Sequence, residues 1–315
     1  MKAIVCTRFG PPEVLRLEDV EIPNPGPNEV LVRVYAAAVS VSDCVIRSGR
    51  VKPAMWLPFR LFVGFRRPRH AVLGIELSGE IESIGTKITR FRPGDRIFAF
   101  TGRRFGAYGE YVCLREGGQH MPTDCVIASK PANISHAQAA TVPTRATLAF
   151  HFLRKANIQS GHKVLIYGAS GGVGTFAIQL AKHFGAEVTG VSSTANLDLV
   201  RSLGADRVLD YTVQDGTTVG GPYDVFLDAV GFKKSSPLKL RCQAALARGG
   251  RLVSVDAAAK VPAGYLDILK DLLAADKIRP VVDRVYPLAE TAAAHHNVEA
   301  GHKRGGVAIA MTPHE

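Results

Sequence analysis

The sequence predicts an α/β fold of two domains, a doubly wound parallel sheet and a partly closed antiparallel barrel. From Lys163 to Val191, a buried strand, a glycine-dense turn, a helical segment and a second β-branched run form one βαβ unit. After Ala139, long helical segments alternate with short apolar strands, which indicates a parallel sheet. Before residue 125, short β-type runs are broken by Pro and Gly, as in a partly closed barrel.

The strands of each domain can be read from their apolar runs. The predicted barrel strands are AIVCTRF, EVLVRVYAAAVS, ELSGEIESIG, RIFAFTG and GAYGEYVCL. The predicted sheet strands are VLIYG, VTGVS, RVLDY, DVFLDAV and RLVSVD. A helix over Tyr265–Lys277 and the barrel-like runs VVDRVYPL and GVAIAM follow them. We therefore expect a first domain over 1–125, completed by 263–315, and a second domain over 126–262.

The glycine-dense turn carries the clearest chemical signal. Gly168, Gly171 and Gly174 are three residues apart, and Gly172 is a fourth position without a Cβ. Such a turn lets the backbone approach a pyrophosphate, while the N–H groups of the first helical turn attract its charge. A turn without a ligand is the alternative, and a kinase-type P-loop is disfavoured because no Gly-Lys-Ser/Thr closes the motif. The predicted dinucleotide-binding residues are Gly168, Ala169, Ser170, Gly171, Gly172, Val173 and Gly174, with Val230 at the end of a later strand.

The end of the second strand selects the cofactor. A site specific for NAD places a carboxylate about 20 residues after the glycines, where it binds the ribose hydroxyls and repels a 2′-phosphate. This chain has neutral donors there instead, Ser192, Ser193, Thr194 and Asn196, and Tyr211 ends the next strand. The sequence therefore favours NADPH, although no Arg or Lys lies in the turn itself. Helix capping is the alternative role of the serines.

The length and composition indicate a globular protein. With 315 residues, 46% hydrophobic and 21% charged, the chain can form about two domains with substantial cores. No segment has the apolar length needed to span a bilayer, and the N-terminus MKAIVCTRFG lacks the apolar core of a signal peptide. We therefore expect a cytoplasmic protein without a membrane partner. The five cysteines are scattered without a CxxC pair, which predicts reduced thiols and neither a disulfide framework nor a zinc site.

The chain is basic, with a formal net charge of +11 and a pI near 9.6. Part of the excess forms two clusters, which comprise Arg60, Arg66, Arg67, Arg69 and His70, and then Arg90, Arg92, Arg96, Arg103 and Arg104. Such a surface attracts anions, among them the cofactor's phosphates or nucleic acid. A solvated basic face is the alternative, and we favour it because no nucleic-acid-binding fold accompanies the charge.

Several segments together resemble one family. They are the opening MKAIVCTRFGPPEVLRLEDVEIPNPGPNEVLVRV, then LGIELSGEIESIG, FRPGDRIFAF, GAYGEYV, the SLGADRVLDY that follows the glycine turn, and the ending KIRPVVDRVYPLAETAAAHHNVEAGHKRGGVAI. In these segments the chain resembles the medium-chain dehydrogenase/reductase superfamily, in its zinc-independent quinone oxidoreductase-like branch. The resemblance covers nearly the whole chain, and it implies a GroES-like catalytic domain joined to a Rossmann domain.

The same resemblance allows zinc to be tested residue by residue. Zinc-dependent relatives have a cysteine ligand where Ser40 stands, and Gly-His-Glu where this chain has Gly74, Ile75 and Glu76. The four-cysteine lobe of a structural zinc is also missing in the region of TGRRFGAYGEYVC. Ser40, Asp43 and Glu76 do not supply the N/S ligand set that zinc selects. We therefore expect no metal.

Without zinc to polarise an alcohol or a carbonyl group, we expect hydride transfer to an acceptor that is already electrophilic. The resemblance and this chemistry predict an enzyme, an NADPH-dependent oxidoreductase that acts on a quinone or an α,β-unsaturated carbonyl compound. The alternatives are an NAD(P)-dependent alcohol dehydrogenase or carbonyl reductase, and a non-catalytic NADPH-binding protein that binds RNA.

The resemblance also indicates residues of the catalytic cleft. Ser40 and Asp43 stand where relatives have Asn-x-x-Asp, and Tyr108 lies in a loop that faces the cleft in relatives, so that it is a candidate proton donor. Each has a structural alternative, since Asp43 can cap a helix, Ser40 can satisfy backbone groups and Tyr108 can be a packing residue. The predicted apolar substrate lining comprises Met55, Trp56 and Phe105.

One connection is shorter than in the relatives. After RLVSVD only AAAKVPAG precedes Tyr265, where relatives have a further β-strand. Eight residues that include Pro262 and Gly264 can connect two elements but hardly form another sheet strand with its turns. In relatives that strand often pairs across a dimer and helps to hold the nicotinamide carboxamide. We therefore expect a monomer or a homodimer through another face, with RLVSVD as a terminal strand buried beneath its helices.

Overall fold

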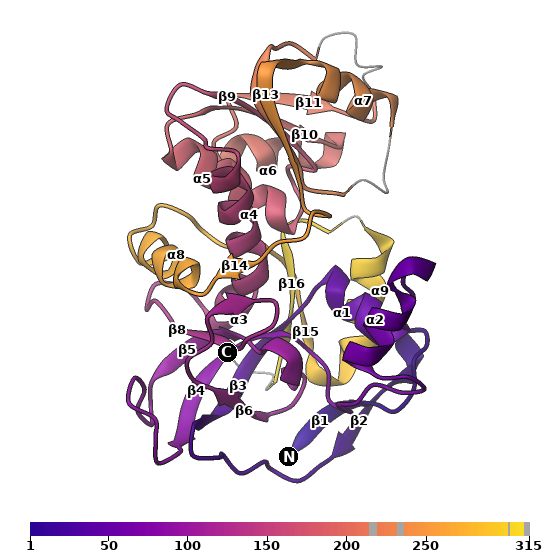
Figure 1. The fold of residues 1–315 in the computed structure, drawn as a ribbon, viewed down its shortest axis with the longest axis vertical. Coiled ribbons are helices and arrows are strands. Elements are labelled where there is room, and N and C mark those ends of the chain that lie inside the picture. The colour runs from indigo at the N-terminus through magenta and orange to yellow at the C-terminus, as the bar shows by residue number, and fades with distance from the viewer. Residues whose placement is uncertain (214–218, 232–235, 302, 312–315) are drawn as a thin grey trace. The chain divides into compact units, whose positions relative to one another are not determined.

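The chain divides into two compact units, each built from separate stretches of sequence. The computed structural model describes residues 1–213, 219–231, 236–301 and 303–311, and Figure 1 shows the ribbon. The first unit comprises Met1–Thr144, Pro262–Asp271 and Val282–Glu315. The second unit comprises Arg145–Val261 and Leu272–Val281.

A seven-stranded sheet forms the first unit. Its strands are β3 (Glu29–Val39), β4 (Glu76–Ile84), β5 (Arg96–Phe100), β6 (Tyr111–Arg115), β8 (Val126–Ser129), β15 (Val282–Pro287) and β16 (Gly306–Ala310). They follow the order β15-β16-β3-β4-β5-β8, with β6 also paired to β3, and every pair is antiparallel except β15 with β16. The order has two free ends, so the described strands form an open structure and not a closed barrel.

The long strand β3 holds this unit together because both of its faces are covered. Val30, Val32 and Val34 belong to the main hydrophobic core. Ala36 and Ala38 face a second cluster with Ala140, and their small side chains let a helix pack closely on the sheet. The remaining strands and helices of this part of the chain are β1 (Lys2–Cys6), β2 (Leu15–Asp19), β7 (His120–Met121), α1 (Val41–Ser48), α2 (Pro53–Val63), α3 (His136–Ala140) and α9 (Thr291–Ala300), with 3₁₀ helices η1 (Pro12–Val14), η2 (Gly102–Arg104) and η4 (Leu288–Glu290).

The second unit is the predicted parallel sheet with its helices. Its strands are β9 (Lys163–Tyr167), β10 (Glu187–Ser192), β11 (Arg207–Asp210), β12 (Tyr223–Asp228) and β13 (Leu246–Ser254). All pairs are parallel in the order β11-β10-β9-β12-β13. The direction of the strand order changes between β9 and β12, which is the point where such sheets bind ligands. The helices are α4 (Pro143–Lys155), α5 (Gly172–His183), α6 (Leu197–Ser202), α7 (Pro237–Ala244) and the 3₁₀ helix η3 (Thr194–Asn196). The helix α8 (Gly264–Ala274) is divided between the units, with residues 264–271 in the first and 272–274 in the second.

The boundary between the units differs from the predicted one at residue 125. The strand β8 pairs with β5, and α3 packs on β3 and β4, so the first unit continues to Thr144. Conversely, residues 272–281 belong to the second unit, where the Gln179 side chain donates to the Arg279 carbonyl and accepts its N–H. Both differences have one cause, because long-range pairing is not visible in local composition.

The short connection after β13 behaves partly as predicted. Val261–Pro262 forms a two-residue strand, β14, which pairs with β7, and β13 is an edge of the described parallel sheet. The expectation that β13 is buried is wrong, since Arg248, Arg251 and Leu252 are exposed. An exposed edge retains groups that can pair, so burial gives no argument for a monomer.

Among the described residues, no helix has both the length and the apolar character needed to cross a membrane.

Two histidines in the first unit are buried, with basic side chains nearby. His295 on α9 has no exposed surface, and its Nδ1 lies 3.4 Å from Cys44 Sγ. Burial, with Arg47 nearby, lowers the pKa of His295 from 6.5 to about 3. The Nδ1 of His136 lies 2.9 Å from Ser78 Oγ, and burial lowers the pKa of His136 to about 4. Protonation of either ring therefore favours the unfolded chain.

We predict that the protein loses stability as the pH falls from 6.5 towards 4. Both histidines have folded pKa values below their ordinary value, so their contribution is complete above pH 6.5 and is lost in acid. Each group adds a slope of about 1.4 kcal/mol per pH unit inside this window. Urea unfolding across the window should show a smaller slope for His295→Gln, while His183→Gln, at an exposed position of α5, should leave the slope unchanged. An unchanged slope in His295→Gln would contradict the assignment.

Candidate dinucleotide site

The glycine turn lies where the parallel sheet changes direction. It follows β9 directly, and α5 begins at Gly172. Gly168 has a φ of +83°, and a Cβ at this position would lie 2.4 Å from Cγ1 of Val230. Val230, predicted as part of the site, thus packs against the turn. Gly168 has to be glycine both for its backbone conformation and for this contact.

The N-terminus of α5 has no side-chain cap. Its N-cap residue is Gly171, with extended backbone, and no side chain accepts a hydrogen bond from the first turn. The first N–H groups of a helix lack partners within the helix and carry the positive end of its dipole. This end of α5 therefore offers several donors to an anion at the mouth of the turn.

Gly174 lets α5 lie directly against the backbone of the turn. In the structure, a Cβ at Gly174 would lie 2.2 Å from the Gly168 carbonyl oxygen and 2.8 Å from Ala169 Cα. The absence of a side chain therefore lets α5 pack directly on the backbone of the turn, and a substitution would strain the turn itself.

The predicted neutral donors meet at the end of β10. The Ser192 hydroxyl donates to Ser170 Oγ at 2.8 Å. The Asn196 amide donates to Ser170 Oγ at 3.3 Å and to Ser193 Oγ at 3.2 Å. Ser192 is only 1% exposed, so Ser193 is the serine whose hydroxyl is partly accessible. Tyr211 is exposed and joins this group through its N–H, which donates to the Ser192 carbonyl.

The Thr194 hydroxyl is bonded to the carboxylate of Asp210, a residue that the sequence does not indicate as part of the site. The Thr194 hydroxyl donates to Asp210, and Thr212 donates to Asp210 from its backbone N–H and its hydroxyl. Burial alone would raise the pKa of Asp210, but the hydrogen bonds from the two threonines outweigh it and the pKa is lowered. Asp210 is thus a buried anion whose described contacts satisfy it, and it is 5% exposed.

Arg145 is a second residue that the sequence reasoning missed. It lies on α4 and is 5% exposed. Its Cδ and Nε lie 2.9 Å and 3.0 Å from the position of a Cβ on Gly172, so the side chain crosses the first turn of α5. A guanidinium beside the positive end of a helix favours an anion between them. No local pattern indicates this role, because Arg145 is far from the glycines in sequence.

The opposite wall of the site is fixed by a buried ion pair. Asp228, at the end of β12, is fully buried and lies 2.8 Å from Lys239 Nζ. Asp228 also accepts the N–H groups of Val230 and Gly231, and Lys239 donates to the Gly231 carbonyl at 2.7 Å. These bonds hold the loop that presses Val230 against the glycine turn.

The predicted catalytic residues have structural roles in the first unit. Ser40 and Asp43 form a capping box at α1, where Ser40 donates from its backbone and its hydroxyl to Asp43 Oδ2 at 2.8 Å and 2.6 Å. Asp43 is 1% exposed. Tyr108 was predicted as a candidate proton donor, with a packing role as the alternative. Tyr108 has no exposed surface and packs edge-on to His295 within the core.

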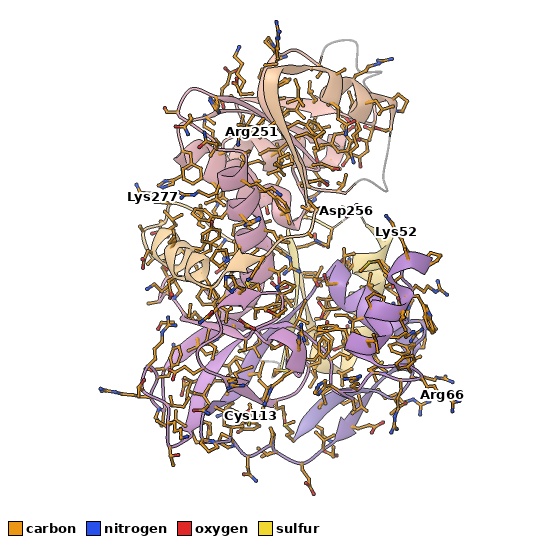
Figure 2. The ribbon with its side chains drawn as sticks, viewed as in Figure 1. Lys52, Arg66, Cys113, Arg251, Asp256 and Lys277 are labelled. Atoms are coloured by element: carbon orange, nitrogen blue, oxygen red, sulfur yellow. The ribbon has the colours of Figure 1, made fainter. Side chains whose placement is uncertain are left out.

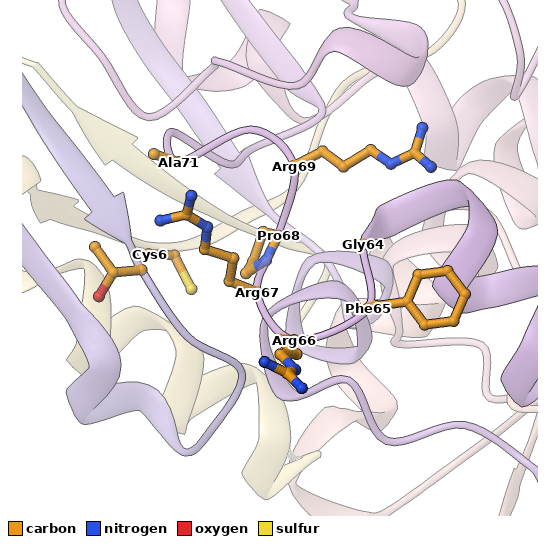
Figure 3. Close-up of a pocket in the computed structure, with 9 residues that line it drawn as sticks. Cys6, Gly64, Phe65, Arg66, Arg67, Pro68, Arg69 and Ala71 are labelled. Carbon is orange, nitrogen blue, oxygen red and sulfur yellow. The ribbon is translucent and has the colours of Figure 1, made fainter.

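The predicted substrate lining is not assembled into one pocket. Met55 and Trp56 are exposed on α2, whereas Phe105 is buried and contacts Phe62 and His70 edge-on. A pocket elsewhere in the first unit has a volume of about 480 Å³ (Figure 3). It is lined by Cys6, Thr7, Gly64, Phe65, Arg66, Arg67, Pro68, Arg69 and Ala71.

The positions of the zinc ligands in relatives do not fit a metal here. The Ser40 hydroxyl is used in the capping box, and Ile75 is an apolar, buried side chain. Glu76 is fully buried and accepts the N–H of Thr144 at 2.7 Å. In the part of the chain that the structure describes, no three His, Cys, Asp or Glu side chains group in a way that could hold a metal ion.

The fold and the glycine turn define a two-domain dehydrogenase or reductase, and comparison with known proteins agrees. Residues 26–124 match the alcohol dehydrogenase GroES-like domain, and residues 172–275 and 261–309 match models of zinc-binding dehydrogenases. The chain is 31% identical to the NADPH-dependent alkenal/one oxidoreductase, chloroplastic, of Arabidopsis thaliana, over 99% of this chain and 80% of that protein. It is equally similar, with the same coverage, to the 2-methylene-furan-3-one reductase of Solanum lycopersicum.

A solved structure shows the same fold over the whole chain. The quinone oxidoreductase from Coxiella burnetii matches with a TM-score of 0.83 and 29% identity, over 99% of both chains. The chain belongs to the medium-chain dehydrogenase/reductase superfamily, in its quinone oxidoreductase-like branch. The predicted family and fold class are confirmed.

We predict that Gly174→Ala destabilises the second unit and weakens dinucleotide binding. The added Cβ meets the Gly168 carbonyl at 2.2 Å, and such overpacking costs about 1–3 kcal/mol. Urea unfolding and calorimetric titration with NADPH measure the two effects. The control is Gly264→Ala at the start of α8, where an added Cβ meets no atom within 4 Å. Wild-type stability and affinity in Gly174→Ala would refute the close-packing role.

Proposed function

We propose that the protein is an NADPH-dependent oxidoreductase that transfers hydride to a quinone or an α,β-unsaturated carbonyl compound without zinc. The observation that carries this proposal is the neutral cluster of Ser170, Ser192, Ser193 and Asn196 beside the uncapped end of α5. A carboxylate there would repel a 2′-phosphate, and this cluster offers hydroxyl donors instead. The relatives named as alkenal/one and quinone oxidoreductases support the choice of acceptor.

Each part of the dinucleotide has residues that fit it. The N–H groups of the first turn of α5, with Arg145 beside them, suit the pyrophosphate. Ser193, which Asn196 holds through a hydrogen bond, and the exposed Tyr211 suit the 2′-phosphate, which accepts hydrogen bonds from their hydroxyl groups. Val230 and Gly168 close the turn beneath the cofactor. When bound, the reduced nicotinamide supplies a hydride, and the protein supplies position and exclusion of water.

The acceptor has to be electrophilic without help from a metal. The residues at the zinc positions of relatives are a capping serine, an isoleucine and a buried, hydrogen-bonded glutamate. A conjugated enone meets this requirement, because hydride addition to its β-carbon places the negative charge on the carbonyl oxygen as an enolate. The α-carbon then takes a proton, which completes a two-electron reduction of the carbon–carbon double bond. Since Tyr108 is buried, we assign this proton to solvent water.

The function is tested by a panel of acceptors with NADPH and NADH, followed by nicotinamide absorbance. We expect turnover of small quinones and enones with NADPH, and no oxidation of simple alcohols with NADP⁺. Activity should persist after treatment with a chelator, because the residues do not form a zinc site. Turnover of alcohols that is lost on chelation, with about one zinc per chain by elemental analysis, would replace this function with that of an alcohol dehydrogenase.

We predict that Ser193→Asp reverses the preference between NADPH and NADH. The new carboxylate repels the 2′-phosphate and accepts hydrogen bonds from the ribose hydroxyls of NADH. Ser192 is a poorer choice, since it is 1% exposed and a charge there would be buried. Calorimetric titrations should show NADPH affinity reduced on the order of tenfold or more, and the neutral variant Ser193→Asn should keep the wild-type order. An equal loss of affinity for NADPH and for NADH in Ser193→Asp would contradict the assignment of Ser193 to the 2′-phosphate.

We predict that Arg145→Ala weakens the binding of NADPH and the binding of NADH by the same factor. The pyrophosphate is common to both cofactors, so loss of the guanidinium beside Gly172 should not change the preference. A loss on the order of tenfold is expected for one charge-assisted contact. Arg145→Lys keeps the charge and should recover part of the affinity. A loss of affinity for NADPH alone would show that Arg145 contacts the 2′-phosphate and not the pyrophosphate.

A further inference from the structure

The outward face of α2 is apolar along its whole length. Its exposed side chains on this face are Ala54, Met55, Leu57, Pro58, Leu61 and Phe62. Four of them are large, and 40–54% of their surface is exposed. A surface helix normally turns polar side chains to water, so a helix with this pattern lacks a partner on its outer side.

The inner face of α2 shows that the helix is anchored. Val63 is 1% exposed. The one polar side chain of α2, Arg60, is turned inward, and its guanidinium carbon lies 4.2 Å from the centre of the Phe9 ring and 5.7 Å from that of Trp56. A helix held in this way presents its outer face in a fixed orientation.

The exposed apolar residues are concentrated and not scattered. Among the described residues, fifteen large hydrophobic side chains are exposed, and six of them lie between Met55 and Phe65. Single exposed hydrophobic residues are normal on a protein surface, whereas a contiguous patch marks a site of interaction. We call these residues, with the loop Arg66–Arg69 that follows, the α2 patch.

The α2 patch lies in a strongly basic segment. Between Cys44 and Ile75 the chain has seven Arg or Lys residues and no Asp or Glu. The side chains of Arg66, Arg67 and Arg69 are exposed and form no ion pair with any described residue, and Figure 3 shows them along the loop that lines the large pocket. Figure 2 shows Lys52 and Arg66 on the same margin of the first unit as α2.

The other basic cluster differs in its pairing. Arg90 pairs with Asp267 at 2.8 Å, Arg96 approaches Glu80 at 3.6 Å, and Arg104 pairs with Glu29. Those arginines are neutralised within the protein. The positive charge of the α2 patch therefore has no internal counterpart, and it remains available to an external anion.

We propose that the α2 patch docks the protein on the surface of an anionic lipid membrane. Large apolar side chains, a tryptophan among them, would enter the boundary between headgroups and acyl chains, and the arginines would contact the headgroup phosphates. A convex helix with a broad apolar face suits a fluid phase that adapts to it, whereas a protein partner requires a preformed groove. The sequence led us to expect no membrane partner because no segment spans a bilayer, and docking on a surface requires no span.

The single tryptophan reports directly on this docking. The chain contains one tryptophan, Trp56, which lies in the α2 patch and is 47% exposed. The full chain is mixed with vesicles of phosphatidylcholine alone or with added phosphatidylserine. We expect the emission of Trp56 to shift to shorter wavelengths, and the protein to sediment with the vesicles, only when phosphatidylserine is present. Salt should weaken the binding, because headgroup contacts are screened.

Two double variants separate the apolar and the charged contributions. Met55→Ser with Leu61→Ser removes two side chains that are each 54% exposed, and Arg66→Glu with Arg67→Glu reverses two unpaired charges. We expect the affinity for anionic vesicles to fall on the order of tenfold or more in each. The matched controls are Leu17→Ser with Val285→Ser, at positions 44% and 46% exposed, and Lys87→Glu with Arg92→Glu, and they should change the affinity by less than about twofold.

Several results would overturn the proposal. Absence of vesicle binding, or equal losses in the α2 variants and their controls, would show that the patch does not dock on lipid. A Trp56 shift that depends on protein concentration without vesicles would assign the patch to a contact between two copies of the chain. A shift on addition of NADPH alone would assign α2 to the enzyme's own substrate site. Because vesicle binding is measured without an acceptor, this proposal and the proposed hydride transfer fail separately.

Discussion

The site depends on the direct contact between the backbone of the glycine turn and the first turn of α5. A Cβ at Gly174 would come within 2.2 Å of the Gly168 carbonyl, so the helix and the turn approach more closely than any side chain allows. This approach places the uncapped N-terminus of α5 at the end of β9, beside the point where the strand order changes direction. The uncapped end of the helix and the polar cluster at β10 therefore meet at one place.

The opposite wall of the site is held by a buried ion pair, whose removal from water costs free energy. Asp228 and Lys239 are both buried, and removing two charges from water costs several kcal/mol per ion before their attraction is counted. The pair is satisfied by further bonds to Ser254, to the N–H groups of Val230 and Gly231, and to the Gly231 carbonyl. Loss of one partner would leave a buried charge, at a cost of about 3–5 kcal/mol. Residues 229–231 after β12 are therefore fixed, and with them the packing of Val230 on Gly168.

The sequence predicts those features that depend on neighbouring residues. The turn, its flanking strand and helix, and the serines after β10 all follow from local spacing, and the structure brings them together. It does not predict Arg145, the Asp228–Lys239 pair or the burial of Tyr108, because each depends on elements far apart in the chain. The boundary after Thr144 was missed for the same reason, since the pairing of β8 with β5 leaves no compositional trace.

The basic residues, which together give the chain its net positive charge, fall into three groups by burial and pairing. Arg145 and Lys239 are buried in the second unit, where Lys239 balances Asp228 and Arg145 adds to the positive end of α5. Arg90, Arg96 and Arg104 are paired with acids at the surface, and such pairs contribute little to stability. The arginines after α2 form no ion pair with any described residue and lie beside several exposed apolar side chains. Solubility alone requires charge but not hydrophobic exposure beside it, and the concentration of both in one segment is what supports the docking proposed for the α2 patch.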